Sequence, residues 1–149
     1  MWYGDGNAAN GAYPVLGRQT AAWAELEALL HVVETERRNV EVASDCEYVV
    51  KGFNIHRHRY RARAWFARPL AAEPVPHADA WRRIDAAAMR RERRGLHTRV
   101  RWVRGHAAPE HCERGETTPL DAYANNAADA LATRARRAAA AAAGVAPTR

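Results

Sequence analysis

The sequence predicts an α/β fold in which helices pack on a sheet, and three observations lead to this prediction. Alternating apolar and polar residues mark two short strands, and apolar residues spaced three and four apart mark the helices between them. Hydrophobic residues make up 48% and charged residues 27% of the 149 residues, which is typical of a folded protein. Strand patterns that alternate with helix patterns favour the α/β layer architecture. We expect one domain at residues 1–133, followed by an Ala- and Arg-rich helical or disordered tail at residues 134–149.

The beginning of the chain predicts an irregular segment and then a long helix. Residues 1–18 are rich in Gly, Asn and Pro, and they offer only short strand-like pieces at 1–3 and 12–16. A helical pattern of apolar residues starts after Thr20, a residue type that suits an N-cap. The pattern fades in the charged run at 34–38, where we expect the helix to end.

A strand and a short helix are predicted next. Residues 39–45 place Val and Ser on one side and Glu, Ala and Asp on the other, and we expect this strand to be covered on both faces. A short helix at 46–51 should stop at Gly52, because glycine commonly follows the last helical residue.

The second half of the chain alternates in the same way, with one helix and one strand before a final helix. The predicted order is a basic segment with aromatic residues (55–68), a proline-rich loop (69–76), a helix (78–94), a strand (97–104), a long polar loop (105–123) and a last helix (124–143).

The net charge of +6 favours a polyanionic partner, with nucleic acid first. The alternative is compositional, since abundant Arg and Ala are also what a GC-rich genome produces without selection for binding. Two cysteines are too few for a disulfide scaffold, so we expect a reducing, intracellular compartment, either cytoplasm or nucleus. No apolar run approaches the roughly 20 residues that span a bilayer, and the N-terminus lacks a secretory pattern. We therefore expect no membrane partner, and a monomer.

Five residues stand out as candidates for chemistry. Asp45 follows a strand, where ligands collect in open α/β sheets, although it also directly precedes a helix that it would suit as N-cap. Glu25 and Glu27 flank the apolar stripe of the first helix on opposite sides, so spacing does not choose between them. Asp129 lies inside an alanine-rich helix face, where its poor helix propensity calls for a reason such as a metal or an arginine. His106 follows the second strand and suits a proton carrier near neutral pH.

Taken together, four segments resemble the ribonuclease H family, particularly the type carried by retroelements. In chain order they are GRQTAAWAELEALL at 17–30, SDCEYVVKGF at 44–53, VRWVRGHA at 100–107 and NNAADALA at 125–132. The segment HADAWRRIDAAA also resembles the helix that precedes the last strand of that family. The resemblance covers residues 17–132 and implies a ribonuclease-H-like mixed sheet flanked by helices.

The resemblance also implies an activity and a site. Such enzymes hydrolyse the RNA strand of RNA–DNA hybrids with two Mg²⁺ or Mn²⁺ ions, about 3.5–4 Å apart. By matching motifs, the metal ligands would be Glu25 rather than Glu27, Asp45 and Asp129, and His106 would assist proton transfer or product release from a mobile loop.

The basic segment falls where some members of the family carry a protrusion that grips the substrate. Its arginines would contact phosphates and Trp65 would pack or stack, although a solvated basic loop is the alternative. The expected nucleic-acid-binding residues are Arg57, Arg59, Arg61, Arg63, Trp65 and Asn125.

One part of the family pattern is missing, namely the Asp of a D-G-S turn on the first strand. Asp5 lies in GDG, but the 19 residues between Asp5 and Glu25 are too few for three strands and their turns. We therefore expect that the first strands are absent and that the chain is marginally stable and weakly active or inactive. A non-catalytic nucleic-acid-binding remnant is the alternative, and a reverse transcriptase domain in a parent polyprotein is an expected partner.

Overall fold

The computed structural model describes residues 1–12, 20–68 and 73–142, which form two compact units. We call Arg18–Trp102 the sheet unit, and Met1–Gly17 together with Val103–Arg149 the α6 unit. The strand-like piece predicted at 12–16 lies almost entirely outside the described residues. Residues 1–3, the other predicted piece, are described and form no strand.

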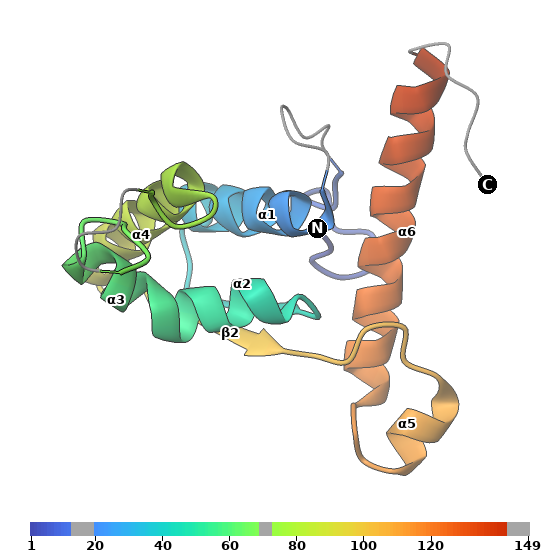
Figure 1. Cartoon of the computed structure of the whole chain (residues 1–149). Coiled ribbons are helices and arrows are strands. Elements are labelled where there is room, and N and C mark those ends of the chain that lie inside the picture. Colours follow the sequence, from blue (N-terminus) through green and yellow to red (C-terminus); the bar gives the residue numbers. More distant parts are fainter. Residues whose placement is uncertain (13–19, 69–72, 143–149) are drawn as a thin grey trace. The chain divides into compact units, whose positions relative to one another are not determined.

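The sheet unit alternates helices and strands as the sequence predicts (Figure 1). Its elements are α1 (Ala21–Thr35), β1 (Val40–Ser44), α2 (Glu47–Lys51), the π-helix η1 (Gly52–His56), α3 (Arg57–Ala62), α4 (Ala78–Arg93) and β2 (Thr98–Trp102). The α/β prediction is therefore confirmed.

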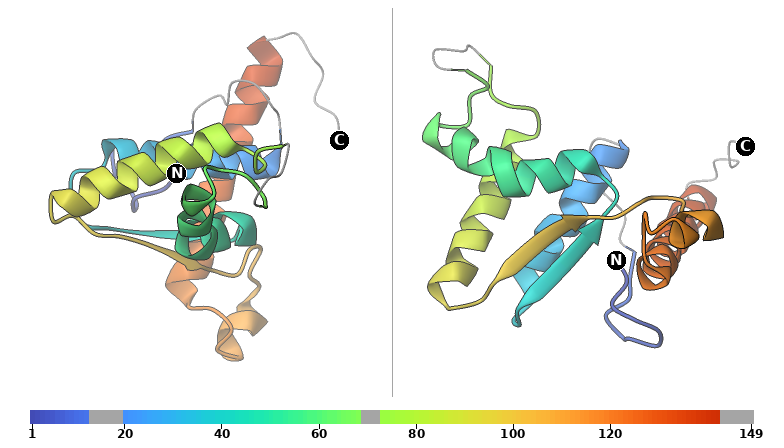
Figure 2. Two further views of the ribbon diagram at one scale, coloured as in Figure 1. Left: turned by 60° about the vertical axis from the view of Figure 1, so that its left-hand side comes forward. Right: turned by 90° about the horizontal axis from the view of Figure 1, so that it is seen from below.

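The strands β1 and β2 lie side by side and parallel, as the right-hand view in Figure 2 shows. Val40 pairs with Thr98 at one end and Ser44 pairs with Trp102 at the other. Short connections lead from α1 into β1 and from α4 into β2, so each helix runs back along its strand. Within the described residues the sheet has only these two strands and parallel pairing, whereas we expected a mixed sheet.

The core of the sheet unit lies between the helices and one face of the sheet. Apolar side chains of α1, α2, η1, α4 and β2 form one buried cluster, and Trp81 at its centre is fully buried. Among its largest members are Leu26, Leu29, Leu30, Phe53, Trp81 and Ile84.

Gly52 does not end the helix, contrary to the prediction. Helical backbone continues from α2 through η1 into α3, so the basic segment begins as helix. A Cβ at position 52 would lie 2.2 Å from two ring carbons of Trp81. The glycine is needed for the close approach of this helix to α4, a reason that local sequence does not reveal.

Two further expectations were wrong. Glu41 and Ala43 of β1 are exposed, and Glu41 pairs with Arg99 and Arg101 on that face, so within this unit the strand is covered on one side. The predicted polar loop at 105–123 contains the short helix α5 and the first turn of α6.

The α6 unit is built around one long helix. It contains α5 (Pro109–Glu113) and α6 (Pro119–Ala142), which continues past residue 133 into the predicted tail. The N-terminal segment contacts α6, because Tyr123 donates a hydrogen bond to Asp5 (2.9 Å) and stacks edge-on against Trp2. No side chain of α6 among those described is fully buried, in contrast to the sheet unit.

None of the helices in the described ranges combines the length and apolar character that a membrane crossing requires.

Candidate functional site

Glu25 lies at the carboxyl end of β1. Because α1 runs back along β1, the beginning of the helix lies beside the end of the strand. The buried hydroxyl of Ser44 donates a hydrogen bond to Glu25 Oε2 over 3.3 Å. The geometry therefore favours Glu25 over Glu27 as the residue directed at the strand end.

Asp45 follows Ser44 and does not act as the N-cap of α2. Cys46 occupies the N-cap position, and its backbone N–H donates to the Ser44 hydroxyl (3.1 Å). A second hydrogen bond holds α2 against α4, since Trp81 Nε1 of α4 donates to the Tyr48 hydroxyl of α2 (2.9 Å). Burial raises the pKa of Tyr48, so this hydroxyl stays neutral.

Ser44 thus links Glu25 to the beginning of α2, next to Asp45 in the chain. Its hydroxyl donates to Glu25 and accepts from the residue after Asp45. Sequence reasoning placed Ser44 on the same face as Val40 and Val42 but did not select it as a site residue. A hydroxyl at a buried position needs a hydrogen-bond partner, which was the available signal.

His106 and Asp129 lie together in the α6 unit. His106 Nδ1 is 3.6 Å from Asp129 Oδ2, and the imidazole is 89% exposed. The connection that leads from His106 to α6 is held by an ion pair between Arg104 and Glu116 (2.8 Å). Arg114, and to a lesser extent Arg104, lower the pKa of Glu116. The connection expected as a mobile loop therefore carries a helix and ion pairs.

The donor set suits a hard divalent cation, because carboxylate oxygens are the ligands that Mg²⁺ takes in proteins. Of the three predicted ligands, Glu25 and Asp45 belong to the sheet unit and Asp129 belongs to the α6 unit. Within either unit, the described residues do not gather three His, Cys, Asp or Glu side chains around one point.

Arg57 has a different role from the expected phosphate contact. It is 5% exposed, its guanidinium lies 4.5 Å from the centre of the Phe53 ring, and its Nε donates to the Phe53 carbonyl. Its Nη1 pairs with Asp85, itself 3% exposed, over 3.0 Å. Arg57 is therefore part of the core.

The other predicted nucleic-acid contacts are more accessible. Arg59 is exposed, and Arg61 is 42% exposed although it also pairs with Asp85. Arg63 is half-buried and donates to a nearby backbone carbonyl. Trp65 packs against the core cluster, and Asn125 is half-buried on α6.

The comparisons with known proteins agree on one family. A family model described as RNase H matches residues 2–137, a range that includes Asp5. The chain is 36% identical over 94 residues to a ribonuclease H of Phenylobacterium zucineum, covering 62% of this chain and 57% of that protein. A ribonuclease H of Chromobacterium violaceum is 36% identical over 94 residues, 62% of this chain and 60% of that protein.

A longer match links the chain to a ribonuclease H of Pseudomonas fluorescens, 32% identical over 116 residues, 78% of this chain and 65% of that protein. The chain thus spans less than two thirds of the length of these curated relatives. All three are bacterial proteins, and the retroelement subtype stays a prediction.

Proposed function

Because the chain belongs to the RNase H family, we propose that it hydrolyses the RNA strand of RNA–DNA hybrids. Glu25, Asp45 and Asp129 would hold two Mg²⁺ or Mn²⁺ ions, which when bound supply an activated water and charge stabilisation for the leaving oxygen. The observation that supports this most is the hydrogen bond from Ser44, the residue before Asp45, to Glu25 at the end of β1.

The residues around the carboxylates have supporting roles in this proposal. Ser44 orients Glu25 by its hydrogen bond, and a fixed carboxylate loses less entropy on binding a cation. His106 lies beside Asp129 and is exposed, so its imidazole is suited to carry a proton to or from solvent.

A hybrid-cleavage assay tests the proposal with matched variants. An RNA–DNA hybrid with a labelled RNA strand is incubated with the full chain in Mg²⁺ or Mn²⁺. We expect Asp45→Asn and Glu25→Gln to abolish cleavage, and Glu27→Gln, two residues along the same helix, to retain it. Cleavage that survives Asp45→Asn would contradict the metal-ligand assignment.

A second candidate function is binding of hybrids without cleavage. Two observations favour it. The sheet of the described residues has two strands, and the Asp5 carboxylate accepts a hydrogen bond from Tyr123. Hybrid binding by the wild-type chain without metal-dependent cleavage would establish it. The variant Asp5→Asn tests in the same assay whether Asp5 contributes to cleavage. Loss of cleavage in this variant would show that Asp5 belongs to the catalytic site.

We also propose the setting of this activity. The protein would act as a monomer in the reducing cytoplasm or nucleus, next to a reverse transcriptase domain in a parent polyprotein. Reading the genomic sequence on either side tests the last point.

A further inference from the structure

A pocket of about 490 Å³ opens at the end of the sheet unit that is remote from Asp45. It lies where α1 and α4 end and their short connections enter the two strands. β1 separates it from Asp45, and its five residues span about 16 Å at roughly 3.3 Å per residue. The pocket is therefore distinct from the candidate metal centre.

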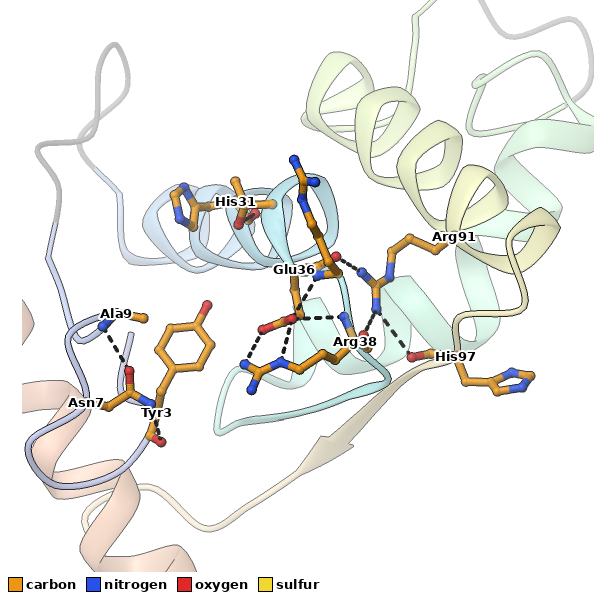
Figure 3. Close-up of polar contacts among 10 residues, drawn as sticks. Tyr3, Asn7, Ala9, His31, Glu36, Arg38, Arg91 and His97 are labelled. Carbon is orange, nitrogen blue, oxygen red and sulfur yellow. Dashed lines mark hydrogen bonds and ion pairs between the residues drawn. The ribbon is translucent and has the colours of Figure 1, made fainter.

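Four guanidinium groups and two carboxylates line this pocket. Arg91 is one of the four, and its role is structural, since it is 4% exposed. It donates to the backbone carbonyls of Glu36 and Arg38 (Figure 3). It also donates to the Thr98 hydroxyl, which ties the end of α1 to the start of β2.

Both carboxylates already have cationic partners from outside the lining. Glu34 pairs with Arg83 (3.0 Å), and Glu36 pairs with Arg38 (2.9 Å; Figure 3). The hydrogen bond from the Arg38 side chain is the main cause that lowers the pKa of Glu36 to about 2, so it stays ionised and paired. Neither carboxylate neutralises the remaining arginines of the pocket.

Those arginines are Arg37, Arg90 and Arg94, and all three are exposed. Their guanidinium groups make no hydrogen bond or ion pair with any residue in the described ranges 1–12, 20–68 and 73–142. The ends of α1 and α4 each offer only about half a negative charge. The carbonyls of Glu36 and Arg38, which follow α1, also accept hydrogen bonds from Arg91. The pocket therefore keeps an excess of positive charge.

We propose that this pocket binds a phosphate-bearing ligand, held by Arg37, Arg90 and Arg94. Guanidinium groups recognise phosphate with two parallel hydrogen bonds, which ammonium groups do not. The apolar part of its lining comes from half-buried Leu96 and from the almost inaccessible Val33 and Ala87. Its volume lies within the range of small-molecule sites, so a ligand of nucleotide size fits. The phosphate comes from a free nucleotide or from the end of a nucleic-acid strand.

Isothermal titration of the full chain in EDTA tests this site without help from metal ions. The probes are inorganic phosphate, ATP, and a single-stranded oligonucleotide with and without a 5′-phosphate. We expect ATP to bind more tightly than phosphate, and Arg90→Gln or Arg94→Gln to weaken each by about tenfold, corresponding to about 1.4 kcal/mol. Tighter binding of the phosphorylated oligonucleotide would identify a strand end as the source, and preference for ATP a free nucleotide.

Arg93→Gln is the matched control, because Arg93 is exposed on the same helix and does not line the pocket. Arg90→Lys should restore part of the affinity, since it keeps the charge and loses the paired donors. The proposal is overturned if no probe binds the wild-type chain. It is equally overturned if Arg93→Gln weakens binding as much as Arg90→Gln. Hybrid cleavage is not the readout, so this outcome is independent of the proposed activity.

Discussion

Two arginine-rich stretches of the sheet unit look alike in sequence but hold the fold by different contacts. Arg57, near the start of one, is 5% exposed and pairs with the carboxylate of Asp85. Arg91, in the other, is 4% exposed and donates to uncharged backbone carbonyls and a hydroxyl. The arginines of these stretches therefore fall into two groups. Buried arginines hold the core together, and their exposed neighbours are available to a ligand.

The difference in partners decides what each arginine contributes. Removing one member of a buried ion pair leaves a charge without compensation, whereas a backbone carbonyl that loses its donor is neutral. Loss of a partner should therefore lower the free energy of unfolding more in the stretch around Arg57 than in the stretch around Arg91.

The largest effect is expected for Asp85→Ala. The change leaves the buried guanidinium of Arg57 without its main carboxylate, while alanine keeps the helix propensity of α4. We expect a loss of about 3–5 kcal/mol in the free energy of unfolding. Urea denaturation followed by circular dichroism measures it.

The control replaces the pair with apolar side chains, as Arg57→Met with Asp85→Leu. Arg61, the second partner of Asp85, is 42% exposed and can turn to solvent. We expect the double variant to recover most of the stability, since apolar replacement of a buried pair is often neutral or stabilising. A double variant as unstable as Asp85→Ala would show that the ion pair itself stabilises the core.

Arg91→Met should lower the free energy of unfolding less than Asp85→Ala does. The change removes the donors to the Glu36 and Arg38 carbonyls but keeps an apolar stem of similar length. We expect a loss of about 1–3 kcal/mol in the same denaturation experiment. A loss larger than that of Asp85→Ala would contradict the distinction between charged and neutral partners.

The sequence predicted most of the sheet unit, because its apolar periodicity is regular. The helix at 78–94 and both strands end within two residues of the observed bounds. The continuation of the helix through Gly52 was not predictable, because it depends on Trp81, 29 positions further along the chain. The burial of Arg57 was missed for the same reason, since Asp85 reaches it only in the folded chain.

The candidate site was predictable only in part. Motifs singled out Glu25, and the fold brings it beside Ser44 at the strand end. His106 and Asp129 were selected by two separate motifs, and the structure brings them close to one another. No local pattern specifies the 3.6 Å between their side chains. Their roles in metal binding and proton transfer stay predictions.

A smaller effect is expected for exposed Arg59, in binding of RNA–DNA hybrid. Arg59→Gln should weaken binding by a few fold and reduce the salt dependence by about one counterion, as loss of one phosphate contact does. Fluorescence anisotropy at several salt concentrations measures both. Arg82→Gln is the control, since Arg82 is an exposed arginine that pairs with Asp79 on α4. Equal effects of the two changes would indicate attraction by net charge alone.

The smallest effect is expected for Glu36, near Arg91, whose contribution to stability depends on pH. The folded-state pKa of Glu36 is lowered to about 2, below its ordinary value of 4.5, mainly by the hydrogen bond from Arg38. The carboxylate therefore contributes stability above about pH 4.5, and this contribution disappears as the pH falls toward 2. Since Arg38 is largely exposed, we expect less than about 1 kcal/mol. Comparing the wild-type chain with Glu36→Gln by urea denaturation between pH 6 and pH 2.5 measures this contribution. A difference in stability that stays constant over this range would show that Glu36 acts by packing and not by its charge.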